Sequence, residues 1–178
     1  MRQMKKHSRE RGSAVTQTVL MAAVLIFIIM PVFSAVIEKY ILMEKARVIT
    51  DSVDMTNISA YNALSSAELG KVRIGAERSD ILEIYRHILS INLRLNDDLE
   101  PQPDSVAEGC VEVLSLEIFS SDFPAHCPEG VPITRPAVHS TIRVPVRPSL
   151  YRGIILGMLG REYVDIIVHV DTEIPVNN

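Results

Sequence analysis

The chain has 178 residues, a composition typical of a globular protein and a formal net charge of −4. This length leaves room for one modest domain beside a short anchor and excludes two large domains. The charge is uneven, because residues 1–11 hold five basic residues and one acidic residue, which leaves −8 on residues 12–178. A nucleic-acid-binding surface needs basic residues gathered in a patch, so we expect no nucleic acid among the partners.

A long uncharged segment follows this basic leader, which comprises residues 1–12. Residues 12–37 carry no charged side chain, and Pro31 and Ser34 are the only interruptions in the apolar run 19–37. Roughly 20 helical residues cross a bilayer core. We therefore predict a transmembrane helix over residues 13–37. The preceding basic residues place the N-terminus in the cytoplasm and the C-terminal domain outside.

Two other interpretations of this segment are weaker. A cleaved secretory signal normally has an apolar region of about 7–15 residues and small residues before the cut. Here the apolar run is longer, and Phe33 occupies a position of the triplet 33–35 where a small residue belongs. A buried core helix of a soluble protein fits the length and the basic flank less well still.

The helical pattern continues beyond the apolar segment. Residues 38–69 lack proline and glycine, and apolar residues recur there at helical spacing among charged ones. We predict an amphipathic stalk helix over residues 38–70, stopped near Gly70, which makes one helix of about 50 residues with the membrane segment.

Residues 71–178 are predicted to form an extracytoplasmic α+β head. A second helix is expected from about residue 80 to 95, where one apolar stripe recurs at helical spacing. Three later segments rich in β-branched residues are predicted to be strands of a small antiparallel sheet packed on the projecting helix: 111–119, 138–146 and 163–174. The predicted fold class is therefore α+β, with a long N-terminal helix, a second helix and this sheet.

The only cysteines are Cys110 and Cys127, and both follow the membrane segment. Outside the cytoplasm disulfides persist. A bridge between these two residues would close a loop of about 18 residues and contribute roughly 3 kcal/mol. A metal site is the competing interpretation, because His126 stands beside Cys127, but no CxxC or HxxxH spacing supports it. We predict the disulfide and no metal ligand.

No enzyme motif is present. The sequence has no G-x-S-x-G, P-loop, G-x-G-x-x-G or H-E-x-x-H pattern. His139 and His169 lie on predicted strands that can pair side by side, and an anchored enzyme would use them with nearby acids. Without a carboxylate at fixed spacing, surface histidines are the simpler interpretation. We predict no catalytic residue, no cofactor and no enzymatic activity.

An apolar segment joins the last two predicted strands. We predict that residues 149–160 form a loop that caps the core of the sheet. The alternative is an apolar edge offered to a neighbouring subunit or to the membrane surface. The residues of this apolar contact loop are Ile154, Ile155, Leu156, Met158 and Leu159.

The junction of leader and helix carries a family resemblance. A basic leader ends in Gly12, and Ser13-Ala14-Val15-Thr16-Gln17 opens the long hydrophobic helix. This junction resembles the prepilin class of signal, in which a membrane peptidase cuts after the glycine and leaves the next residue, here Ser13, as the mature N-terminus.

Three passages make the chain resemble the TadE/TadG-like pseudopilins, the minor pilins of tight-adherence (Flp, type IVc) pilus systems. They cover about half of the chain: RERGSAVTQTVLMAAVLIFIIMPVFSAVI, ARVITDSVDMTNISAYNAL and STIRVPVRPSLYRGIILGMLGREYVDIIVHVDTEI. The resemblance implies a structural protein of pilus assembly in a bacterial inner or cytoplasmic membrane. Its implied partners are other pilins or pseudopilins, the assembly platform, membrane lipid and a prepilin peptidase.

Gln17 departs from the family pattern, which has glutamate five residues after the cut. A neutral amide cannot form the charge pair with a neighbour's new N-terminus that is attributed to this glutamate. Two roles stay open, a minor pilin within a filament and an assembly factor that remains in the membrane. The competing class of function is a membrane-tethered extracytoplasmic sensor or binding domain unrelated to pili.

Overall fold

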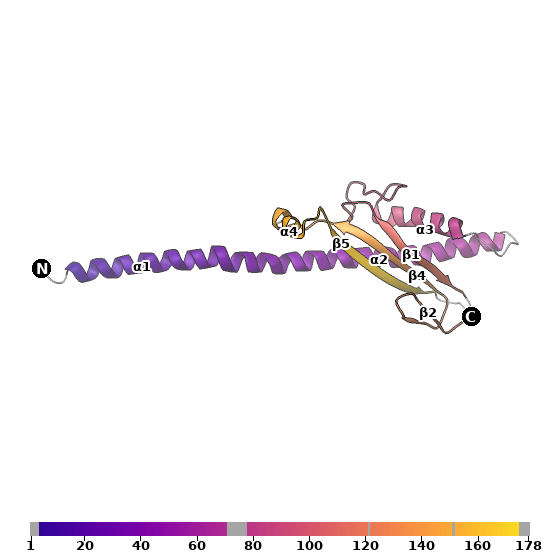
Figure 1. The fold of residues 1–178 in the computed structure, drawn as a ribbon, viewed down its shortest axis with the longest axis horizontal. Coiled ribbons are helices and arrows are strands. Elements are labelled where there is room, and N and C mark those ends of the chain that lie inside the picture. Colours follow the sequence, from indigo (N-terminus) through magenta and orange to yellow (C-terminus); the bar gives the residue numbers. More distant parts are fainter. Residues whose placement is uncertain (1–3, 71–77, 121, 151, 175–178) are drawn as a thin grey trace. The chain divides into compact units, whose positions relative to one another are not determined.

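The structure is a computed structural model that describes residues 4–70, 78–120, 122–150 and 152–174, with side chains described for 14–63 and from 81 onward within these ranges. The chain divides into two compact units, Met1–Leu42 and Met43–Asn178. The fold is α+β, as predicted: a long N-terminal helix, a second helix and small antiparallel sheets (Figure 1).

The first unit is helical throughout the residues described. It comprises α1 (Met4–Val24), the π-helical turn η1 (Leu25–Ile29) and the beginning of α2 (Met30–Gly70). The π turn ends two residues before Pro31, whose backbone nitrogen has no hydrogen to donate and whose ring crowds the preceding turn. At this point the Met30 N–H donates to the Leu25 carbonyl, which gives the wider turn.

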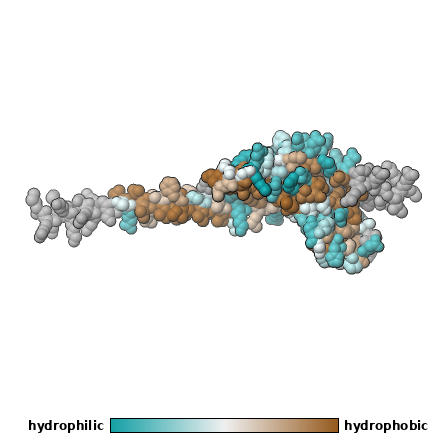
Figure 2. Space-filling view, in the orientation of Figure 1, coloured by the Kyte–Doolittle hydropathy of each residue, from teal (hydrophilic) through white to brown (hydrophobic). Residues whose placement is uncertain are grey.

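The described part of this helix exposes a long apolar surface. Ala14–Ala63 is long and apolar enough to cross a membrane, and none of its most apolar stretch is buried. Figure 2 shows this stretch as a largely brown surface. A single-pass anchor fits these features, and so does a signal sequence, since both are apolar helices near an N-terminus.

The second unit begins within α2 and is built on a three-stranded sheet. The strands are β1 (Glu112–Phe119), β4 (Ala137–Val146) and β5 (Val164–Glu173), in the order β1-β4-β5 with antiparallel neighbours. All three correspond to predicted strands. The register pairs Val146 with Val164 and Ala137 with Glu173, so β4 and β5 match along their whole length.

The core of this unit lies between the helices and one face of the sheet. Helix α2 contributes Ile49 and Val53, and α3 (Arg78–Leu93), the predicted second helix, contributes Tyr85 and Leu89. The apolar strand residues on the α2 side of the sheet have alternate positions, since successive side chains of a strand point to opposite faces: Val138, Ile142, Val144, Val168 and Val170. Strand β4 is buried on its other face as well, along nearly its whole length. The predicted packing of the sheet on the long helix is therefore confirmed for residues 43–63.

A polar contact joins α2 to the sheet. Asn57 is fully buried, and its amide donates to the Val138 and Val170 carbonyls at 3.3 and 3.4 Å and to Thr172 Oγ1 at 2.9 Å. Its Oδ1 accepts from Ser140 Oγ at 2.8 Å. Because every polar atom of this side chain is satisfied, the contact fixes the position of α2 on the sheet without leaving a buried group unpaired.

Two short elements were not predicted. Strands β2 (Ala125–His126) and β3 (Pro132–Ile133) form a separate two-stranded hairpin. The predicted apolar contact loop is a helix, α4 (Arg152–Leu159), and it buries no residue. Ile154, Met158 and Leu159 are exposed, while Ile155 and Leu156 are half-buried, so the prediction that this segment caps the core is wrong.

Candidate functional site

A cluster of polar side chains lies on the face of the sheet opposite α2. Ser140 bonds to Asn57 of α2, so its neighbours in β4, His139 and Thr141, lie on the other face. The register pairs His139 with Asp171 and Thr141 with His169, which brings both histidines together diagonally across β4 and β5. Their ring centroids are 4.8 Å apart.

The β2–β3 hairpin brings a thiol and a carboxylate to the same place. The hairpin closes when the Cys127 N–H donates to the Val131 carbonyl at 3.0 Å and the Gly130 N–H donates to the Cys127 carbonyl at 2.8 Å. Gly130 has a φ of 83°, a conformation that favours glycine. The hairpin is tied to β4 because Thr141 Oγ1 donates to Glu129 Oε1 at 2.9 Å.

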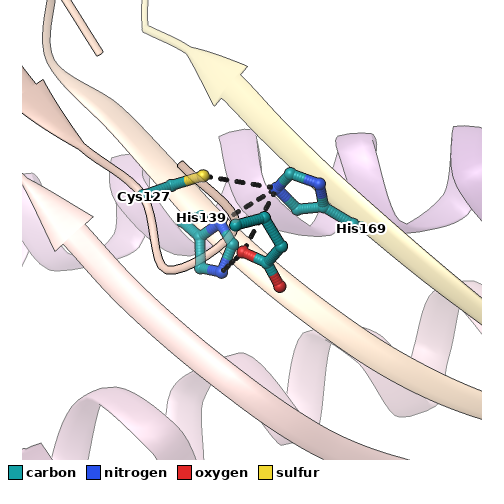
Figure 3. Close-up of side chains that lie close together, drawn as sticks. Cys127, His139 and His169 are labelled. Carbon is teal, nitrogen blue, oxygen red and sulfur yellow. Dashed lines mark hydrogen bonds and ion pairs between the residues drawn. The ribbon is translucent and has the colours of Figure 1, made fainter. Parts of the chain in front are cut away.

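Four side chains from these elements converge (Figure 3). Each of Cys127, Glu129, His139 and His169 offers one ligand-type atom, and these atoms lie within 4.8 Å of one another. The Nε2 of His169 is 3.8 Å from Cys127 Sγ and 3.7 Å from Glu129 Oε2. The Nε2 of His139 is 3.2 Å from Glu129 Oε2.

Asp171 supports this group from β5. Its Oδ1 is 2.7 Å from His139 Nδ1, and its Oδ2 is 3.0 Å from His169 Nε2. The side chain of His139 is 0% exposed, so this carboxylate holds a fully buried ring. Asp171 is 15% exposed and lies at the edge of the cluster.

Glu129 is ionised at neutral pH. Partial desolvation opposes ionisation, but the hydrogen bond from Thr141 and the nearby His139 and His169 outweigh it and hold the pKa of this carboxyl below its usual value. The cluster therefore combines one thiol, two imidazoles and two carboxylates.

The chain matches no protein-family model, no curated protein and no solved structure. The chemistry of the cluster follows from its geometry alone. A nucleophilic relay needs the thiol and the orienting acid on opposite nitrogens of one histidine. Cys127 and Asp171 both approach Nε2 of His169, and Cys127 is only 4% exposed. This arrangement does not fit nucleophilic catalysis, whereas it fits a metal site, which needs several donor atoms around one point.

The predicted disulfide is not seen, and both cysteines are free. Cys110 is exposed, with Sγ 3.7 Å from the Asp98 carbonyl, while Cys127 is buried and its Sγ accepts from the Val131 N–H at 3.4 Å. The two thiols therefore have different surroundings, and the Cys127 thiol lies beside His169. The expectation of surface histidines is wrong for His139, which is fully buried.

The predicted processing residues lie at the beginning of the helix. Gly12, Ser13 and Gln17 are all within α1, where Gln17 is exposed, while the side chain of Ser13 lies outside the described residues. Sequence reasoning missed Glu129, because it lies in a turn with no recognisable spacing. The sequence did carry a signal for His169 and Asp171: they are two residues apart in a predicted strand, so their side chains lie on the same face of it.

Proposed function

We propose that this chain is a membrane-anchored, pseudopilin-like structural protein that acts in the assembly of a Tad/Flp-type surface pilus. The observation that carries the proposal is the helix Ala14–Ala63, which is exposed and apolar in its first half and forms part of the folded core in its second. A pilin-like protein needs this division, because one half must mix with lipid or with other apolar helices while the other holds a head.

The apolar half supports an anchor. Phe27, Ile28 and Val32 are 77%, 58% and 60% exposed, and such a surface requires lipid or a protein partner. The basic leader orients the helix with the N-terminus in the cytoplasm and the head outside. The same half gives neighbouring subunits an apolar surface for packing once the protein leaves the lipid.

The second half supports a rigid connection to the head. Besides Asn57, Lys45 on α2 donates to Glu108 Oε1 at 3.2 Å and to the Arg147 carbonyl at 2.9 Å. These contacts, at two levels of the helix, would transmit force between the head and α2 without a flexible linker. A mechanical role in an assembly needs this property, while a tethered binding domain does not.

The direct test is deletion of the gene in its own host, with surface pili counted by electron microscopy. The proposal predicts loss or strong reduction of pili, restored by the wild-type gene in trans. Normal pili in the deletion strain would contradict the proposal and favour the alternative, a membrane-tethered sensor or binding domain.

The mature N-terminus separates the two roles within the proposal. Mass spectrometry that finds Ser13 as the first residue identifies a processed minor pilin. An intact leader identifies an assembly factor that stays in the membrane, the role that Gln17 favours because it lacks the negative charge of the usual glutamate.

A further inference from the structure

We propose that Cys127, Glu129, His139 and His169 form a structural zinc site that fastens the β2–β3 hairpin to the main sheet. The cluster contains the donor types that Zn²⁺ takes in proteins, namely thiolate, imidazole and carboxylate. Ca²⁺ and Mg²⁺ prefer oxygen ligands alone, and Cu⁺ prefers mainly sulfur ligands. This inference concerns the head only and does not depend on the proposed role in pili.

The spacing of the donor atoms suits a tetrahedral ion. Bond lengths of about 2.0–2.3 Å place the ligand atoms of a tetrahedral zinc site about 3.3–3.6 Å apart. The separations between Glu129 Oε2 and His139 Nε2, Glu129 Oε2 and His169 Nε2, and Cys127 Sγ and His169 Nε2 are 3.2, 3.7 and 3.8 Å. The widest pair is within 4.8 Å, so ligation needs a contraction of about 1.2–1.5 Å at most.

A buried ring nitrogen that makes no hydrogen bond within the described part of the chain gives further support. His139 Nε2 is buried and makes no hydrogen bond to any residue that the structure describes, although Glu129 Oε2 is 3.2 Å away. Buried polar atoms in proteins are nearly always paired. With Nδ1 protonated and donating to Asp171 Oδ1 at 2.7 Å, Nε2 presents a lone pair toward the cluster. A cation would satisfy it there.

Asp171 is then a positioning residue. Metal-binding histidines commonly donate their other ring nitrogen to a carboxylate, which fixes the tautomer and the ring orientation. Asp171 does this for His139. Its second oxygen, 3.0 Å from His169 Nε2, gives up that contact when this nitrogen takes the metal.

The position of the ligands indicates a structural role for the ion. Two ligands come from adjacent strands of the sheet, and two come from the turn between β2 and β3. Four protein ligands fill a tetrahedral shell and leave no position for a substrate. A bound ion would therefore cross-link residues 125–133 to β4 and β5.

The test uses the full-length chain in detergent, stripped of metal and titrated with Zn²⁺ alone. We expect about one tightly bound zinc per chain by mass spectrometry of the eluted metal. At a hundredfold excess over Kd the melting temperature should rise by roughly 5–11 °C. Hydrogen exchange in residues 125–133 should slow, and Co²⁺ in place of zinc should give a thiolate charge-transfer band.

Variants identify the ligands. Cys127→Ser should abolish the charge-transfer band, His169→Gln should abolish tight zinc binding, and Asp171→Asn should weaken zinc binding about 10–100-fold. The matched controls are Cys110→Ser and His126→Ala, which change the other thiol and the adjacent exposed imidazole and should leave binding unchanged. Circular dichroism of the metal-free variants shows whether they remain folded.

Three outcomes would overturn the proposal. The first is the absence of zinc binding by the folded wild-type chain. The second is zinc binding that survives Cys127→Ser and His169→Gln together. The third is equal loss in the Cys110→Ser or His126→Ala controls, which would indicate adventitious binding elsewhere.

Discussion

At the scale of single residues, Asn57 joins the long helix to the sheet most directly. Its amide bonds to two strand carbonyls and to Thr172, and Thr172 Oγ1 in turn donates to Asp54 Oδ1 at 2.6 Å. Asn57→Ala removes the bonds that this amide donates, takes away the oxygen that accepts from Ser140 Oγ and opens a cavity. We expect the free energy of unfolding to fall by about 2–4 kcal/mol, measured by chemical denaturation in detergent.

The control for this substitution is Asn92→Ala on α3. Asn92 is exposed and its amide donates to Thr56 Oγ1 at 2.8 Å, so its removal should cost less than about 1 kcal/mol. If the two substitutions lowered the free energy of unfolding equally, the buried network around Asn57 would stabilise the fold no more than the exposed hydrogen bond of Asn92.

Tyr85 gives the head a defined response to alkaline pH. Burial raises the pKa of its phenol from 10.0 to about 12. Between these values the unfolded chain has released a proton that the folded chain retains, so stability falls as pH rises from 10 to 12. The loss reaches about 2 kcal/mol at pH 12.

Tyr85→Phe removes the titrating group, so urea midpoints of this variant should depend less on pH above 10 than those of the wild type. The same alkaline slope in both proteins would contradict a buried, neutral phenol at this position.

At the scale of elements, the two halves of the long helix should tolerate charge differently. Ile28 and Met55 are 58% and 60% exposed on the same continuous helix, so they form a matched pair. Ile28→Asp places a carboxylate within the proposed membrane span at a cost of about 2.5–3.5 kcal/mol, while Met55→Asp faces water and should cost less than about 1 kcal/mol.

Membrane fractionation with carbonate extraction measures this difference. We expect Met55→Asp to remain in the membrane and Ile28→Asp to be depleted from it or degraded. If both variants behaved alike, the boundary between the apolar and the core-forming half would be wrong.

Helix α4 exposes apolar side chains on the head, so we expect it to contact a partner. Ile154 and Met158 are 61% and 84% exposed, so replacing both with serine should change stability by less than about 0.5 kcal/mol per site. We expect reduced co-purification with partner pilins. Ile91→Ser on α3, where Ile91 is 63% exposed, is the control that should leave co-purification unchanged. A lowered melting temperature of the α4 variant would instead indicate a role within the head.

The helices and strands that could be predicted from the sequence are those in which a pattern of apolar residues is sustained over many positions. The apolar run 19–37, the helical stripe of α3 and the alternation in β5 each extend over several turns or residue pairs, so local pattern decides them. Strands β2 and β3 have two residues each and carry no period. Helix α4 is short and carries glycines at 153 and 157, a pattern that also suits a loop.

At the scale of the whole molecule, the polar cluster shows why sites are harder to predict than elements. Its residues come from a turn and from two strands joined by a helix, and only the strand register brings them together. The sequence allowed His139 and His169 to pair across a hairpin, but it could not show that the β2–β3 turn covers them. The same turn keeps Cys127 beside His169. The sequence instead predicts a disulfide between Cys127 and Cys110.

The central claim is that residues 14–37 cross a membrane and hold the head outside the cytoplasm. The most direct measurement is a topology reporter fused after Asn178 in a bacterial host, with alkaline phosphatase active only outside and a fluorescent protein active only inside. The account predicts phosphatase activity in the membrane fraction and no fluorescence. A fluorescent C-terminus, or a full-length product found in the soluble fraction, would contradict it.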